Sequence, residues 1–568
     1  MDSSNENRDE SSFGHAVLSQ FCLDPSYINL NVGSFGCLPH AVRIAYDQLS
    51  LELEAMPDLF IRRKMASQVT QVRTLLATHT GATVDNCVMI PSVAHGINTI
   101  LRNFPWNEND KLIIASTTFH TISRAVDCLS FTDPHPTVST FECLFPTSHT
   151  EILNNFRKCV QSTKAADSSA SVETRGQYHT VVLFDSIISM PGVCMPWKEM
   201  VRICKDEGVW SIVDAAHSLG QELNIELDDT DPDFWVANCN KWLSSKRGSA
   251  LLYVPLRNQD IIKYSFPPGI GAASPSNTGV SAFVGEFHWN GSKDIITALT
   301  VKAALEFRSS HGGEERIINY CHNLAMSGGK YLADMLGTEV MLSPSGNPDE
   351  LVGNMVNVAI PLPPALKPSA DLMRRIDKTL LEEKKVYAAV FYHNRRWWTR
   401  VSVHIFNEVL SLWGLDVFHQ FIVGAFVYHY LITAPGSRLL DWTFVANLVL
   451  ELLLSNIIQI FYAVRLWKLT PKPKLVFLAV VPLIINNLFL GIYVPVNLSN
   501  QVADVSKIAD INFKWAVITL LAGTSALDFI LSTSLIHALI RMGSQMRWAT
   551  SSLQVVAAFV ANTGFLAR

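Results

Sequence analysis

The sequence lacks the paired cysteines that a zinc site or a disulfide framework requires. Its ten cysteines are scattered, no two of them form a Cys-x-x-Cys pair, and none lies after residue 400. Zinc ligands come at close, regular spacings, and disulfides are rare in reducing compartments. We therefore expect no metal site and a chain that resides in a reducing compartment.

The sequence also has little net charge. A formal charge of −5 over 568 residues implies no nucleic-acid surface. Charged side chains are frequent up to about residue 400 and sparse afterwards, where long apolar runs begin. This change predicts a soluble part followed by a membrane part.

The first dozen residues lack the features of a targeting segment. They read MDSSNENRDESS, with neither a basic region nor an apolar region, so no N-terminal signal peptide is expected. A polar, acidic stretch of this kind cannot bury enough apolar surface to fold by itself. We predict a disordered leader over residues 1–20.

One stretch in the middle of the chain carries the clearest chemical signal. An apolar strand-like run, 209–213, ends in Asp214; His217 follows three residues later, and Asn240, Lys241 and Trp242 come further on. A lysine that bonds covalently to the cofactor and an acid that keeps the pyridine nitrogen protonated are what a pyridoxal phosphate (PLP) site needs. A surface lysine and a helix-capping aspartate are the alternative.

The residues around this stretch alternate between strand-like and helical patterns. Apolar strand runs are expected at Lys111–Ala115 and at Val181–Phe184, which ends in Asp185, and helical segments separate them. Such alternation favours a mostly parallel sheet with helices on both faces. Ligand groups in such folds lie at the carboxyl ends of the strands.

Five motifs in order make residues 25–408 resemble the class V (fold type I) PLP-dependent transferases. The resemblance is strongest to isopenicillin-N epimerase-like proteins, cysteine desulfurases and the C–S lyases of ergothioneine synthesis. The motifs are Leu30–Pro39, Val213–Gly220, Lys241-Trp242, Phe287–Asp294 and Arg400–Asn407. The resemblance implies an α/β large domain over 21–310, and a small α+β domain over 311–408 that takes in part of the N-terminal segment.

The resemblance also implies roles for individual residues. Lys241 would bind PLP covalently, Asp214 would pair with the pyridine nitrogen and His217 would contact the phenolic oxygen; these three are the candidate catalytic residues. Ser292 resembles a residue that reaches the phosphate of a neighbouring subunit, which implies a homodimer. The other expected cofactor contacts are Ala94, His95, Phe119, His120 and Asn240, and the expected substrate contacts are Arg400, Asn31 and Ser34, with Arg400 binding the α-carboxylate.

The reaction within this family is less defined by the sequence. The stretch Pro57–Arg62 is similar to the ergothioneine-pathway lyases, so cleavage of a C–S bond in a cysteine S-conjugate is the leading hypothesis. We find no mobile-loop cysteine of the kind that cysteine desulfurases use. An aminotransferase or an amino-acid epimerase remains the alternative.

The apolar runs beyond residue 409 are each long enough to cross a bilayer as a helix. We expect about five spans, at 410–432, 442–464, 475–497, 515–540 and 548–566, forming an all-α transmembrane bundle over 409–568. Basic residues near the joints predict a multi-pass membrane protein whose catalytic domain faces the cytosol. The segment resembles part of a fungal seven-helix membrane family of unknown function. A membrane receptor-like protein with a degenerate PLP-like binding domain is therefore a further alternative.

Overall fold

The computed structural model describes residues 13–166, 179–266, 268, 281–288, 291, 293–362 and 366–408. All structural statements below concern these residues. The predicted disordered leader overlaps them, because His15–Leu18 form helix α1 and the side chain of Val17 is buried. Val17 packs into the apolar core of the C-terminal part of the fold, so residues 15–18 of the predicted leader are helical.

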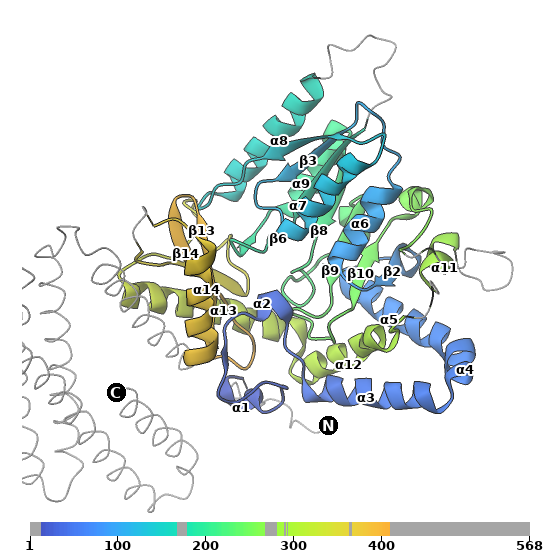
Figure 1. Cartoon of the computed structure of the whole chain (residues 1–568), viewed down its shortest axis with the longest axis horizontal. Helices are drawn as coiled ribbons and strands as arrows, with labels where there is room; N and C mark the ends of the chain where they lie inside the picture. The colour runs from blue at the N-terminus through green and yellow to red at the C-terminus, as the bar shows by residue number, and fades with distance from the viewer. Residues whose placement is uncertain are drawn as a thin grey trace, which may run out of the picture. The chain divides into compact units, whose positions relative to one another are not determined.

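The centre of the fold is a seven-stranded sheet in the order β2-β10-β9-β8-β5-β3-β4 (Figure 1). Strands β9, β8, β5, β3 and β4 run parallel, and β10 is antiparallel to both of its neighbours. This confirms the predicted mostly parallel sheet. The bounds are β2 (Cys87–Ile90), β3 (Lys111–Ala115), β4 (Thr137–Phe141), β5 (Thr180–Asp185), β8 (Trp210–Asp214), β9 (Phe234–Asn238) and β10 (Ala250–Tyr253).

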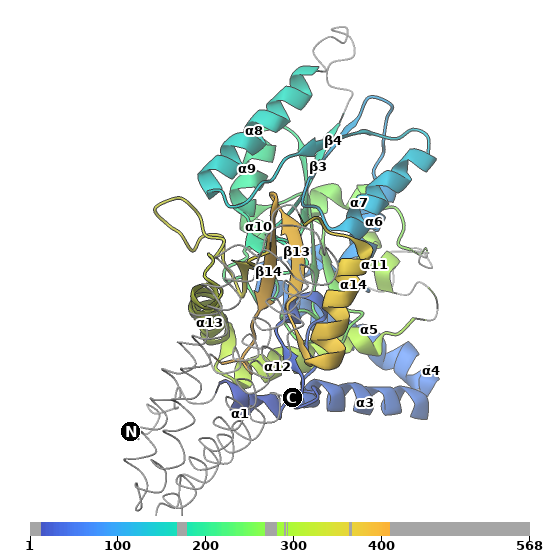
Figure 2. The same cartoon turned by 60° about the vertical axis from the view of Figure 1, so that its left-hand side comes forward.

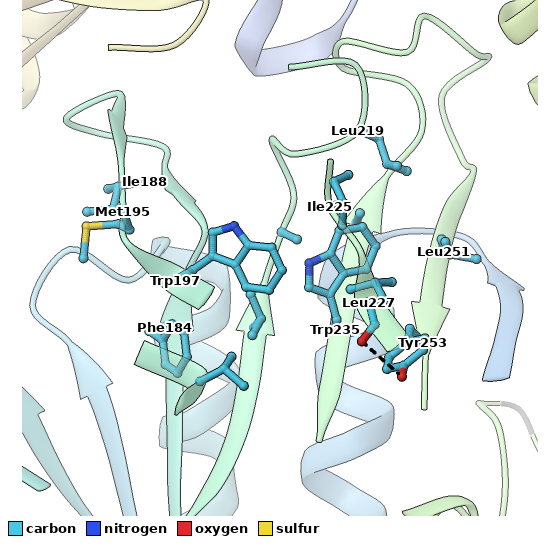
Figure 3. Packing of buried hydrophobic residues seen from close by; sticks show 14 of the residues in the cluster. Phe184, Ile188, Met195, Trp197, Leu219, Ile225, Leu227, Trp235, Leu251 and Tyr253 are labelled. Carbon is cyan, nitrogen blue, oxygen red and sulfur yellow. Dashed lines mark hydrogen bonds between the residues drawn. The ribbon is translucent and has the colours of Figure 1, made fainter. Parts of the chain in front are cut away.

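Helices cover both faces of this sheet (Figures 1 and 2). Side chains alternate along a strand, so Val182 and Phe184 of β5 join one core while Val181 and Leu183 join the other. Figure 3 shows part of the first core, with Phe184 and Trp235 among other buried apolar side chains. The first core also takes in α5 (Met65–Thr80), α8 (His149–Ala166), α9 (Trp197–Glu207) and α12 (Ile296–Ser310), and the second takes in α6 (Val93–Asn103), α7 (His120–Asp127) and α11 (Ala282–His288).

A smaller antiparallel sheet, in the order β11-β14-β13, follows the large one in the chain. The N-terminal segment joins this part, because β1 pairs in parallel with β12. The division at 310/311 stays a prediction; near it, α12 ends at Ser310 and α13 begins at Gly313. The bounds are β1 (Ile28–Asn29), β11 (Met355–Ala359), β12 (Val386–Tyr387), β13 (Ala389–His393), β14 (Arg396–Ser402), α13 (Gly313–Leu336) and α14 (Ala370–Lys378).

The remaining elements are short except for one long N-terminal helix, α3. They are α2 (Val32–Phe35), α3 (His40–Ala55), α4 (Pro57–Leu59), α10 (Leu227–Thr230), β6 (Ile187–Ile188) and β7 (Val193–Cys194). Helix α2 lies within the predicted motif Leu30–Pro39 and is followed by Gly36, which adopts φ 70° and ψ 173°. That backbone region is accessible essentially to glycine alone.

The predicted multi-pass membrane localisation, with its cytosol-facing catalytic domain, is wrong. Among the helices of the described residues, none is long and apolar enough to span a bilayer. The longest, α13, has 24 residues but carries charged side chains along one side and buries the other. The five predicted spans and the predicted bundle lie at 409–568, outside the described residues.

Candidate active site

The predicted catalytic residues come from neighbouring parallel strands. Asp214 is the last residue of β8, and Lys241 follows shortly after the end of β9. Because parallel strands end at the same edge of a sheet, the two side chains lie at one carboxyl edge. The third predicted residue joins them, since Nε2 of His217 lies 3.0 Å from Nζ of Lys241.

The surroundings of Lys241 lower the pKa of its amine. Burial lowers the pKa of Lys241 to about 8; the charge of Asp214 opposes this effect, and the charge of Arg400 adds to it. Burial, together with the positive charges of Lys241 and Arg400, holds the pKa of His217 well below its usual range. Near neutral pH the site therefore holds a neutral imidazole beside an amine that loses its proton easily.

A second buried acid lies beside Asp214. Asp185 ends β5, and its register partner in β8 is Asp214. Burial raises the pKa of Asp214 to about 6, although the backbone N–H of Ala216 donates to its Oδ1 at 3.0 Å. Burial and the Asp214 charge raise the pKa of Asp185 well above its usual range.

Sequence reasoning noted Asp185 only as the end of a strand and gave it no role. Its side chain is 4% exposed, and its Oδ2 atom has no hydrogen-bond partner among the described residues. A buried polar atom without a partner is costly in a folded protein. The signal that could have identified it is its position at the end of a strand next to the Asp214 strand.

The three predicted substrate contacts meet at one point. Arg400, on β14, is fully buried, and its Nη2 donates to Oδ1 of Asn31 at 2.8 Å and to Oγ of Ser34 at 2.7 Å. Its Nη1 donates to the backbone carbonyl of Ser189 at 2.5 Å. All of these acceptors are neutral. Among the described residues no carboxylate forms an ion pair with Arg400, and its Nε has no partner.

The loop after helix α2 packs directly on the backbone of the candidate lysine. A Cβ added to Gly36 would lie 1.8 Å from the carbonyl oxygen of Asn240. Asn240 was predicted to contact the cofactor, but in the structure its side-chain amide donates to the carbonyl of Phe35 at 3.3 Å. Arg247 also donates to Phe35, at 2.8 Å, so this loop fixes the position of the Lys241 backbone.

The other predicted cofactor contacts lie at helix N-termini. Ala94 and His95 are in the first turn of α6, where Oγ of Ser92 accepts a hydrogen bond from the His95 backbone at 3.2 Å. Phe119 and His120 begin α7, where both are exposed and their rings lie edge to face 4.3 Å apart. A helix N-terminus offers backbone N–H groups that suit a phosphate. Ser292 lies outside the described residues.

Comparisons with known proteins agree with this geometry. Residues 160–360 match the family described as Aminotransferase class-V. An L-cysteine desulfhydrase-like protein of Epichloe uncinata is 32% identical, over 70% of this chain and 93% of its own length. The chain belongs to the class V aminotransferase family. It is accordingly a PLP-dependent enzyme, which removes the alternative of a degenerate binding module.

Two further relatives span a range of reactions within this family. The hercynylcysteine sulfoxide lyase of Schizosaccharomyces pombe is 30% identical, over 62% of this chain and 84% of its own length. The isopenicillin N epimerase of Streptomyces clavuligerus is 24% identical, over 65% of this chain and 88% of its own length. The resemblance expected from the sequence is thus confirmed for the class V part; nothing supports the fungal membrane family.

Solved structures of low identity share the fold. A cysteine desulfurase of Thermococcus onnurineus has a TM-score of 0.54 and 18% identity, covering 72% of this chain and 98% of its own. A cystine C–S lyase in complex with its product cysteine persulfide has a TM-score of 0.55 and 16% identity, covering 70% and 97%. These matches confirm the predicted PLP-transferase fold type I; the predicted homodimer stays a prediction.

The residues of this class V enzyme fit PLP. The partnerless Oδ2 of Asp185 and the buried, partnerless Oγ1 of Thr118 lie at carboxyl ends of β5 and β3, as polar groups awaiting a ligand would. Lys241 has the lowered pKa that bonding to an aldehyde requires. Asp214, ionised at neutral pH, would hold a protonated pyridine nitrogen, and the α6 N-terminus would hold the phosphate.

Proposed function

We propose that this enzyme cleaves the C–S bond of a cysteine S-conjugate by β-elimination, with Lys241 as its central base. The observation that carries the proposal is that the relatives at 30–32% identity are named as a hercynylcysteine sulfoxide lyase and a cysteine desulfhydrase-like protein. Both names describe reactions at a cysteine-type sulfur. The chain covers 84–93% of the length of these two relatives.

Arg400 would bind the α-carboxylate of the substrate. It is a buried cation whose acceptors within the protein are all neutral, so a carboxylate would be its first counter-charge. Its charge is near enough to lower the pKa of Lys241, which places the bound carboxylate close to the lysine amine. An amino acid held in this way would present its Cα to Lys241.

PLP, when bound, would stabilise the negative charge that develops at the substrate Cα. Lys241 in its unprotonated form would take the Cα proton. The Cβ–S bond would then break, and the sulfur would leave with the bonding electron pair. The released unsaturated amino acid would react with water to give pyruvate and ammonia. His217 would orient the Lys241 amine for this proton transfer, and Asp214 would keep the pyridine nitrogen protonated.

The cysteines favour elimination over sulfur transfer to a protein thiol. Cys37 and Cys239, which are close in sequence to Gly36 and Lys241, are both buried. Burial raises the pKa of Cys37 to about 12 and also raises that of Cys239. Since the thiolate is the nucleophilic form, neither cysteine is prepared to attack a substrate sulfur.

The test is a product analysis of the full-length enzyme with an L-cysteine S-conjugate sulfoxide. We expect stoichiometric pyruvate and ammonia. A mixture of D- and L-substrate without pyruvate would make the enzyme an epimerase, and dependence on a keto-acid acceptor would make it an aminotransferase.

The lysine assignment is tested separately. Lys241→Ala should lose both the visible absorbance band of lysine-bound PLP and the activity, because the amine that would bond to the aldehyde is removed. Lys246→Ala, which removes a lysine stacked on Tyr46 at 4.0 Å, is the matched control and should keep both. A persistent band in Lys241→Ala would contradict the assignment.

A further inference from the structure

The imidazole of His217 has two partners in the fold. On one side its Nε2 lies 3.0 Å from Nζ of Lys241. On the other side the indole Nε1–H of Trp242 donates to Nδ1 of His217 at 3.3 Å. His217 and Trp242 are each 1% exposed, so water does not compete for the contact between the indole and the imidazole.

These two contacts determine which ring nitrogen carries the proton. An indole N–H is a donor only, so Nδ1 of His217 has to present its lone pair. In a neutral imidazole the proton then lies on Nε2. The Nε2–H group faces Lys241, whose amine can accept this hydrogen bond only with a free lone pair, which means without its third proton.

The charges around the two groups agree with this assignment. Lys241 and Arg400 face His217, and both disfavour a protonated imidazole. Asp214, Asp185 and Arg400 face Lys241, where the two acids favour the ammonium form and Arg400 opposes it. A hydrogen bond from His217 adds to the influence of Arg400 against the ammonium form.

Trp242 is itself held in place. Its backbone carbonyl accepts a hydrogen bond from Nη1 of Arg308 at 2.9 Å. Its ring packs where a Cβ on Gly33 would come within 3.0 Å of it, and its carbonyl carbon lies 2.7 Å from where a Cβ on Gly220 would be. The indole N–H therefore has little freedom to turn away from His217.

We propose that Trp242 is a positioning residue whose indole N–H fixes His217 as the Nε2–H tautomer, so that His217 donates to the unprotonated Lys241 amine and cannot accept from its ammonium form. The proposal rests on the assignment of Lys241 in the proposed function but not on the identity of the substrate. It gives Trp242 an influence on the protonation of Lys241 through His217, without a contact to substrate.

The test measures the protonation of Lys241 directly. In full-length protein freed of PLP, competitive labelling with acetic anhydride from pH 6 to pH 10, read by mass spectrometry of the Lys241 peptide, gives its pKa. The wild type should give about 8. Trp242→Phe should raise the value by about one unit, because His217 can then turn its lone pair to the ammonium, and a hydrogen bond of ordinary strength corresponds to about that shift.

Trp235→Phe is the matched control. Trp235 is fully buried in β9 among apolar side chains (Figure 3), and its indole N–H has no partner among the described residues. Its replacement loosens the core without removing a hydrogen bond, so the pKa of Lys241 should not change. An equal shift in Trp235→Phe would overturn the proposal, as would no shift in Trp242→Phe.

A double-mutant cycle separates positioning from packing. In a His217→Ala background, Trp242→Phe should add no further shift; an undiminished shift there would contradict the proposal. If Trp242→Phe does not accumulate as folded protein, benzothienylalanine at position 242 keeps the ring shape and removes only the N–H, and the same shift is expected. An error in the assignment of Lys241 itself would be recognised separately, because the visible absorbance band would then persist in Lys241→Ala.

Discussion

Two buried arginines, Arg308 and Arg400, lie in two regions of the molecule and differ in whether a carboxylate partners their charge. In the Arg308 region, Arg308 is 2% exposed and donates to both carboxylate oxygens of Glu314, at 2.5 and 2.6 Å, and to the carbonyls of Trp242 and Gly220. In the Arg400 region, Arg400 is equally buried but contacts only neutral oxygens. Glu314 compensates the Arg308 charge, whereas no carboxylate of the described residues compensates the Arg400 charge.

The difference has an energetic meaning. Burying a charge costs about several kcal/mol of folding free energy unless a partner of opposite charge compensates for it. Arg308 has that partner. Burial lowers the pKa of Arg400 to about 10, which reflects the missing counter-charge. Both arginines are buried, so it is the lack of a carboxylate partner among the described residues that supports the proposal that Arg400 binds a ligand.

The largest expected effect comes from removing the uncompensated charge. Arg400→Met should lower kcat/KM for the amino-acid substrate by about a thousandfold, since truncating one partner of a buried charge pair costs about 2–5 kcal/mol. The thermal-unfolding midpoint should stay the same or rise, because a buried unpaired charge is removed. Steady-state kinetics and calorimetry measure the two effects.

The matched control for Arg400→Met is a second arginine on β14. Arg396 pairs with Glu339 on the surface, and Arg396→Met should leave kcat/KM unchanged. If Arg400→Met instead destabilised the fold while the folded fraction retained its kcat/KM, Arg400 would belong with Arg308 as a structural residue.

The opposite pattern is expected in the Arg308 region. Arg308→Met should destabilise the fold by about 3 kcal/mol, because it leaves the Glu314 carboxylate without its partner. KM should change little. The double variant Arg308→Met with Glu314→Leu removes both charges and should recover most of the lost stability. If Arg308→Met alone left the free energy of unfolding unchanged, the pair of Arg308 and Glu314 would contribute little to stability, and Arg308 would not be a structural counterpart to Arg400.

The sequence predicted those parts of the site that depend on local pattern. Asp214 and Lys241 are recognisable because an acid ends a strand and the lysine follows the next strand, and strand periodicity is a strong signal. The mostly parallel sheet follows from the same alternation. Asn31, Ser34 and Arg400 lie far apart in the chain and were assigned only through the family resemblance, yet hydrogen bonds bring them together.

What the sequence could not predict depends on packing. The role of Asp185 needs its register against Asp214, and the contact of Trp242 with His217 needs the geometry of two loops. The hydrogen bond from the Asn240 amide to the Phe35 carbonyl likewise depends on packing between distant segments, and the predicted cofactor contact of Asn240 stays a prediction. The membrane localisation was predicted from apolar runs and flanking basic residues, whereas no helix of the described residues is long and apolar enough to span a bilayer.

The smallest expected effect is that of the Arg400 charge on the pKa of Lys241. The rate at which PLP reattaches to cofactor-free, full-length protein should rise with pH with a midpoint near pH 8 and then level off, because only the unprotonated amine bonds to the aldehyde. Since Arg400 lowers the pKa of Lys241, its removal in Arg400→Met should move this midpoint to higher pH, by roughly half a unit for a partly screened charge. In Arg396→Met, which removes an arginine paired with Glu339 on the surface, the midpoint should stay at its wild-type value. Equal midpoints in all three proteins would mean that the Arg400 charge does not influence the pKa of Lys241.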